Sequence, residues 1–215
     1  MNIFFLDIDP IKCAHYHCDK HTIKMITEHA QMMSMAIWYH DMQQAMRLYK
    51  EGHIMNAPAY VTGKPPRNDS HLMHPCTMWV RESKKHFDWL KIMSMELAHE
   101  YYIRFGQFHN PPRHHSSYVN CIAHLSSEKI PDSPWEQPPQ AMPEEYRGPD
   151  AAEAYRRLYG FDKIRFARWS VREMPEWFKP YWRSEFLHRD EESISFLHSR
   201  EFKIPRHPIL TEHDF

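Results

Sequence analysis

The sequence predicts a single all-α domain that carries an irregular, proline-rich loop and a C-terminal tail. Glycine is scarce, with 5 residues in 215, whereas proline reaches 17, a balance typical of helices joined by proline-containing loops. Apolar side chains recur at helical spacing in two long stretches, and 42% of the residues are hydrophobic, enough for a core. We therefore expect a helical catalytic domain at residues 1–180, with residues 181–215 packed on it as the tail.

The first long helical stretch is expected after a short extended or buried lead-in at residues 1–8. Asp9 and Pro10 form a helix-start signal, with aspartate at the N-cap and proline at the first helical position. Good helix formers continue to about Lys50, and Gly52 then ends the stretch. We expect this stretch to be interrupted at most once.

A second helical region is expected from His74-Pro75 to about Phe105, after a loop of turn-forming residues at 53–73, and Gly106 closes it. The side chains expected to face the core from this region are Trp79, Phe87, Leu90, Met93 and Leu97. The following segments are expected to be, in order, an irregular stretch at 107–116, a short helix at 117–126, a long ordered loop at 127–149, and helices at about 150–160 and 161–172. Residues 173–215 are expected to wrap around the body.

The composition excludes several classes of protein. The five glycines stand far apart, so a glycine-rich loop that cradles phosphates is not expected. The chain starts without basic residues, and no stretch approaches about eighteen uncharged apolar residues, so we expect neither a signal peptide nor a membrane span. The 4 cysteines form no C-x-x-C pair and are expected to be reduced thiols in a cytoplasm. With a net charge of −1, nucleic-acid binding would require a local basic patch.

The densest group of chemically active side chains falls in the first helical stretch. In a continuous helix, steps of four, four, three and four residues place five titratable side chains on one stripe: Cys13, His17, His21, Lys24 and Glu28. A stripe that faces a core is normally apolar. This polar stripe therefore predicts a functional site at the centre of the domain, and three interpretations of it stay open.

The first interpretation is an amine site with an acid–base partner. Lys24 and the amino group of Met1 are the available amines, and Glu28 is the carboxylate. An amine that attacks a sugar carbon forms a Schiff base, which can release a base and cleave a strand. An α-amino group has a reference pKa of about 8, against about 10 for lysine. Met1 is therefore the better nucleophile unless Lys24 is strongly desolvated.

The second interpretation is a metal site, and the third is structural. His17 and His21 have the i, i+4 spacing by which one helix offers two imidazoles to zinc, and Cys13 lies one turn earlier. His71 or His74 could supply a further ligand. The glutamate of zinc proteases is missing from the motif. In the structural interpretation, the side chains of the stripe simply form a hydrogen-bonded network or face water.

Two further groups of residues suggest contacts with nucleic acid. His74 precedes Pro75 at a helix start, where free N–H groups attract phosphate, and Arg81 follows two turns later. Residues 155–172 hold six basic residues against one acid, with aromatic residues between them, and Arg165, Arg168 and Arg172 would follow the backbone. The plain alternatives are a capped helix at 74, core aromatic residues and solvated arginines.

At these residues the chain resembles a family of phage proteins over much of residues 1–180. The resemblance is carried by the segment Asn2–Gln31, by His74-Pro75 with Trp79 and Arg81, and by the segment Pro139–Tyr146. The chain is also similar, more distantly, to the pyrimidine-dimer DNA glycosylase/AP lyase family. That similarity lies in the short apolar start, the polar first helix, the His-Pro helix start and a long helix ending in Arg104-Phe105-Gly106.

The second resemblance implies an all-helical enzyme that uses its N-terminal amine as nucleophile and a glutamate on the first helix, and that flips a nucleotide out of the duplex. Two departures matter. Asn2 is large enough for Met1 to be retained, so the free amine would belong to Met1. Lys24 falls where the family glutamate is expected, which leaves Glu28 one turn later and allows a base-modifying reaction instead of excision.

The expected function is therefore that of a DNA base-processing enzyme, glycosylase/lyase-like or base-modifying, that needs no cofactor. Its catalytic residues would be Met1, His17, His21, Lys24 and Glu28, and its contacts with DNA would come from His74, Arg81, Arg165, Arg168 and Arg172. It would act in a cytoplasm, that of the host if the protein is phage-encoded. The alternatives are a zinc-dependent hydrolase using Cys13, His17 and His21, and a non-catalytic phage DNA-binding protein.

Overall fold

The computed structural model describes residues 1–54, 72–106 and 113–187, and within this part it is all-helical, as predicted. Its helices are α1 (Pro10–Tyr16), α2 (Asp19–His40), α3 (Met42–Lys50), α6 (Pro75–Glu82), α7 (Lys84–Phe105), α8 (Arg113–His124), α9 (Ala151–Leu158) and α10 (Lys179–Leu187), with a short 3₁₀ turn η1 (Glu144–Tyr146) and a π-helical turn η2 (Tyr159–Lys163). None of these helices combines the length and apolar character needed to cross a membrane.

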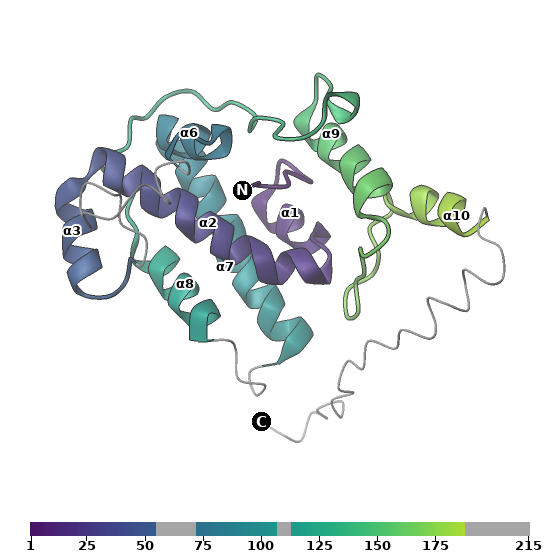
Figure 1. The fold of residues 1–215 in the computed structure, drawn as a ribbon, viewed down its shortest axis with the longest axis horizontal. Coiled ribbons are helices and arrows are strands. Elements are labelled where there is room, and N and C mark those ends of the chain that lie inside the picture. Colours follow the sequence, from purple (N-terminus) through teal and green to yellow (C-terminus); the bar gives the residue numbers. More distant parts are fainter. Residues whose placement is uncertain (55–71, 107–112, 188–215) are drawn as a thin grey trace.

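Two helices of 22 residues, α2 and α7, form the centre of the domain (Figure 1). They pack against each other, α1 packs on α7, and α6 and α8 pack on α2. The loop that follows α8 crosses to α9 and η2, which lie on the opposite side of the molecule from α3, and α10 packs on η2 (Figure 1). The N-terminal segment lies among α1, α2 and α6, so the chain start is close to the centre of the fold.

The first helical stretch has two breaks where the sequence predicted at most one. The predicted start is confirmed, because the Asp9 side chain accepts hydrogen bonds from the N–H groups of Ile11 and Lys12. Helix α1 ends at Tyr16, and the backbone is extended at His17 and Cys18 before α2 begins. A second break follows at Asp41, whose carboxylate caps α3.

The second helical region has a single break, at Ser83. It begins at Pro75 as predicted, with the His74 ring accepting a hydrogen bond from the N–H of Cys76. Ser83 then ends α6 and caps α7. The break is held by the long loop, because Lys84 N–H donates to Pro131 O at 2.7 Å. The predicted core residues Trp79, Phe87, Leu90, Met93 and Leu97 are all buried.

The proline-rich loop is ordered, as predicted. Its backbone bonds to the helices, for example from Glu136 N–H to His86 Nε2 at 2.9 Å, and Met142 lies in the core. Gln140 and Gly148 pair across the end of the loop, where the Gly148 N–H donates to the Gln140 side chain at 2.9 Å. The loop therefore forms part of the wall of the domain.

The predicted helix at 161–172 is wrong. Within this range, regular structure ends with η2 at Lys163, and the residues that follow up to 172 are held by bonds to the start of α2. Asp19 N–H donates to Arg168 O at 2.8 Å, and Ser170 N–H donates to the Asp19 carboxylate at 2.9 Å. These tertiary bonds replace the helical ones.

The remaining predicted boundaries fall partly outside the description. Helix α8 begins at Arg113, earlier than the predicted 117. The predicted loop at 53–73 and the predicted tail fall largely on residues 55–71 and 188–215, which lie outside the described residues, and α10 covers the expected domain boundary at 180.

Candidate functional site

The site is built where the first residues of the chain run along α2 in the direction opposite to the helix. Asn2 lies beside Glu28, since its N–H donates to Glu28 Oε2 at 2.8 Å. Two residues later, the Phe4 ring stacks on the His21 ring with 4.3 Å between centroids. The Asn2 side chain holds the segment in place by donating to Ala141 O of the long loop at 3.0 Å. Met1 precedes Asn2, so the Met1 amine lies one residue from the backbone N–H that binds the Glu28 carboxylate.

Glu28 also meets the second candidate amine. Lys24 Nζ lies 3.0 Å from Glu28 Oε1, one helical turn apart on α2. The Lys24 side chain is 64% exposed, whereas that of Glu28 is only 14% exposed. One carboxylate thus binds the backbone at the chain start with one oxygen and a surface ammonium group with the other.

The five residues of the predicted stripe all lie around residues 1–4, although the helix that was expected to carry them is broken. His21, Lys24 and Glu28 keep their common face because α2 is continuous there. Cys13 arrives from α1, where its thiol donates to Phe4 O at 3.4 Å, and the His17 ring lies edge-on to the Phe4 ring.

The first turn of α6 closes the other side of the site. The Cys76 thiol is close enough to the N-terminal amine and to Glu28 for both to affect its ionisation. The pKa of Cys76 is raised to about 12, mainly by burial and also by Glu28, while the nearby amine acts in the opposite direction. The thiol is therefore protonated at neutral pH, and the helix start that was predicted to bind phosphate lies next to the amine and the carboxylate.

His17 and His29 are buried next to the N-terminal segment with one nitrogen each engaged. His17 Nδ1 donates to Cys13 O at 2.7 Å, and His29 Nδ1 bonds to Ser94 Oγ at 3.0 Å. The Nε2 atoms of both rings are buried without a hydrogen-bond partner. Burial lowers the pKa of His17 to about 4 and holds that of His29 well below its ordinary value, so both rings are neutral.

The ligand set of the zinc alternative is not gathered. Burial raises the pKa of the Cys13 thiol to about 12, which disfavours the thiolate that zinc requires. His21 directs Nδ1 at the hydroxyl of Tyr159, and its ring centroid lies 6.5 Å from that of His17. Among the described residues, the atoms of Cys13, His17 and His21 do not come within metal-binding distance of one another. The break between α1 and α2 is the reason, because it removes the helical spacing on which this alternative depended.

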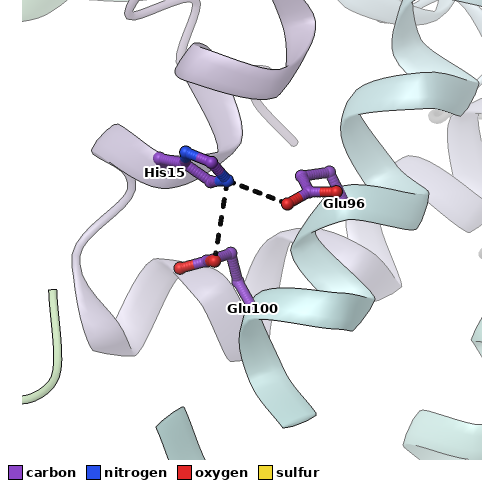
Figure 2. A group of neighbouring side chains, drawn as sticks. All are labelled: His15, Glu96 and Glu100. Carbon is purple, nitrogen blue, oxygen red and sulfur yellow. Dashed lines mark hydrogen bonds and ion pairs between the residues drawn. The ribbon is translucent and has the colours of Figure 1, made fainter. Parts of the chain in front are cut away.

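A different group of ligand-type side chains meets between α1 and α7 (Figure 2). His15 Nε2 lies 2.8 Å from Glu96 Oε1 and 3.7 Å from Glu100 Oε1. This is the one group of three potential metal ligands that the described residues form. Glu100, however, is already satisfied, because Arg104 Nη2 donates to Oε2 at 2.7 Å and Arg172 Nε donates to Oε1 at 3.0 Å. A carboxylate shared by two guanidinium groups has little left for a cation, so we assign this group a structural role.

The residues predicted to bind nucleic acid differ in whether their side chains already have partners within the protein. Arg172 binds Glu100, and its guanidinium is thereby occupied. Arg81 donates to Leu72 O at 3.1 Å and lies over the Tyr39 ring. Arg168 donates to Ala167 O at 2.7 Å and lies over the Trp182 ring. His74 caps α6. Arg165 is exposed.

Some residues of the site carried no signal in the sequence. Asn2 contacts a glutamate 26 residues away, and Tyr159 contacts a histidine 138 residues away, so only the folded chain brings them together. Cys76 was predicted only as one of four reduced cysteines. Comparison of the chain with protein-family models, with curated proteins and with solved structures found no match.

Proposed function

We propose that the protein is a DNA base-processing enzyme in which an amine attacks the sugar of a flipped-out nucleotide and Glu28 transfers the proton. The observation that supports it is the 2.8 Å hydrogen bond from Asn2 N–H to Glu28, which holds the chain start against a carboxylate. A nucleophilic amine needs a nearby base to take its proton, and a half-buried carboxylate within one residue of it meets that need.

The reaction can be followed atom by atom. The amine nitrogen bonds to C1′ of the deoxyribose, the bond from C1′ to the base breaks, and the base leaves with the bonding electrons and takes up a proton. Glu28 accepts the proton that the attacking amine loses. Glu28 then gives this proton to O4′ as the C1′–O4′ bond breaks, which converts the glycosylamine into a protonated Schiff base. The regenerated Glu28 carboxylate can take a proton from C2′, and the 3′-phosphate leaves by β-elimination.

Two amines compete for the role of nucleophile. The α-amine of Met1 is next to the Asn2–Glu28 bond, whereas Lys24 Nζ touches the same carboxylate from the surface. The α-amine is available only in a chain that begins at Met1, so N-terminal sequencing is the first step of any test. The similarity to the pyrimidine-dimer glycosylase family favours Met1, and an all-α domain is compatible with that family's fold.

The test is borohydride trapping of the protein on duplex DNA that contains an abasic site. A covalent adduct is expected, and peptide mapping of the adduct assigns the nitrogen to Met1 or Lys24. Glu28→Gln keeps an oxygen for the Asn2 N–H but cannot transfer a proton, so it should lower the trapping rate by about 10²–10⁴-fold. Lys50→Gln, an exposed lysine on α3, is the matched control and should trap at the normal rate.

The opposite outcomes are equally clear. Full trapping by Glu28→Gln would show that the carboxylate has no part in the reaction. Absence of any adduct, with about one equivalent of zinc in the same preparation, would favour the hydrolase alternative. Absence of both adduct and metal, with retained DNA binding, would favour a base modification without a Schiff base or a non-catalytic DNA-binding protein.

A further inference from the structure

Three lysines surround the histidine that lies one turn before Lys24 on α2. Lys20 and Lys24 flank His21 on the helix, and Lys163 comes from η2, the turn whose Tyr159 hydroxyl bonds to His21 Nδ1. The ring of His21 is fixed on two further sides by aromatic residues. It stacks on Phe4 and meets the Phe166 ring edge-on with 5.5 Å between centroids. Nε2 is the nitrogen that remains for a ligand.

The ammonium group of Lys20 lies over a ring that contacts His21, and those of Lys24 and Lys163 lie near enough to affect the ionisation of His21. Lys20 Nζ lies 5.0 Å from the centroid of Phe166, the ring that also contacts His21. Burial, together with the nearby charges of Lys163, Lys24 and Lys20, lowers the pKa of His21 to about 2. At neutral pH the imidazole is therefore neutral, and the positive charge around it comes from the lysines.

The net charge of the side chains around His21 is positive. Lys24 pairs with Glu28, and Lys163 pairs with Asp162. Within the described part of the chain, Lys20 forms no ion pair, and its contact is the Phe166 ring. Arg165, next to Phe166, adds another exposed cation. Such surroundings attract an anion with several oxygens, because each ammonium group can donate to a different one.

We propose that His21 Nε2, together with the ammonium groups of Lys20, Lys24 and Lys163, binds a backbone phosphate of the nucleic-acid strand beside the nucleotide processed at Glu28. The inference rests on the proposed function for the identity of the strand. With the Tyr159 hydroxyl as the donor to Nδ1, the imidazole proton lies on Nε2, where it can bind a phosphate oxygen. Seven residues of helix, about 10 Å, separate His21 from Glu28, so the bound phosphate neighbours the reacting sugar.

The experiment measures binding of a labelled duplex, containing a stable tetrahydrofuran analogue of the abasic site, as a function of salt concentration. Each phosphate contact contributes about 0.9 to the slope of log K against log salt for duplex DNA. Lys20→Gln and Lys163→Gln should therefore each lower the slope by up to about 0.9. Lys50→Gln, which removes the same charge from α3, should leave it unchanged. Lys24 is left intact because it belongs to the proposed reaction centre.

The readouts separate this inference from the proposed chemistry. Reduced slopes in both variants support the phosphate site even if no borohydride adduct forms. In that case only the proposed attack by an amine is rejected. An adduct in the wild type with unchanged slopes in Lys20→Gln and Lys163→Gln overturns the phosphate site and leaves the chemistry standing. A mononucleotide that competes as strongly as an oligonucleotide of the same sequence would overturn the assignment to a strand, because a free phosphate would then suffice.

Discussion

Phe4 is the one described residue other than glycine with a positive φ, at 51°. A left-handed conformation costs an ordinary residue about 1–2 kcal/mol. Here it is held by what surrounds it, since the Cys13 thiol binds its carbonyl and its ring stacks on His21. The ring of Phe4 thereby contacts both His17, at the break between α1 and α2, and His21 of α2, so this local strain shapes the site.

This conformation predicts an unusual order of stability for two substitutions. Phe4→Ala and Phe4→Gly should both destabilise the fold by several kcal/mol, because both remove a buried ring. The glycine variant should be the more stable of the two by about 1 kcal/mol, since only glycine adopts a positive φ without strain. Urea denaturation of both variants checks this. An alanine variant as stable as the glycine variant would show that position 4 is not strained.

At the scale of single elements, the features predicted correctly are those set by neighbouring residues. The Asp9-Pro10 start, the His74-Pro75 start and the end at Gly106 each depend on a local capping signal. The helix predicted at 161–172 failed because its N–H and C=O groups bond to Asp19, about 150 residues earlier. A pattern of neighbouring residues cannot indicate hydrogen bonds to a residue so far away in the sequence.

The π-helical turn η2 predicts a sharp packing effect at Gly160. A β-carbon at this position would overlap the ring of Tyr181 on α10. Gly160→Ala should therefore displace α10 and expose the adjacent Trp182, which a red shift of tryptophan emission and faster proteolysis near residue 180 would report. Gly148→Ala is the matched control, because its β-carbon meets only the flexible end of Arg157. Equal behaviour of the two variants would contradict the proposed packing of α10.

For the candidate site, the sequence indicated the residue types but not their partners. The common face of His21, Lys24 and Glu28 followed from spacing within one helix, and α2 keeps it. The Arg172 guanidinium, predicted to meet phosphate, binds Glu100 of α7 instead. Spacing within a helix constrains which side chains share a face, whereas the partner of a long, flexible arginine is set by the whole fold.

At the scale of the whole molecule, four buried histidines have lowered pKa values and predict instability in mild acid: His17, His21, His29 and His86. The pKa values of His17, His21 and His29 are all lowered by burial, to about 4, to about 2 and to well below the ordinary value. The unfolded chain takes up protons at these residues below about pH 6.5, whereas the folded chain does not. Their contribution to stability is therefore full above pH 6.5 and is lost as the pH falls toward 4.

The size of this effect is measurable by urea denaturation between pH 7 and pH 5. Each of His17, His21 and His29 should lower the free energy of unfolding by about 2 kcal/mol over that interval. His29→Gln should remove about 2 kcal/mol of this pH dependence, whatever its effect at pH 7. His124→Gln, at an exposed histidine, should not change it. A free energy of unfolding that stays constant from pH 7 to pH 5 would contradict the burial of these rings.

The placement of the N-terminal segment also has a consequence for protein synthesis. Residues Ile3–Leu6 are buried, and the Leu6 carbonyl accepts a bond from Arg156, 150 residues further along the chain. Ribosomes add about 5–20 residues per second, so the partner emerges roughly 8–30 s after the segment does. Until then the bond that joins this segment to α9 cannot form, so the burial of Ile3–Leu6 is completed only late in synthesis, and chaperones that shield apolar peptides can bind the segment before that point.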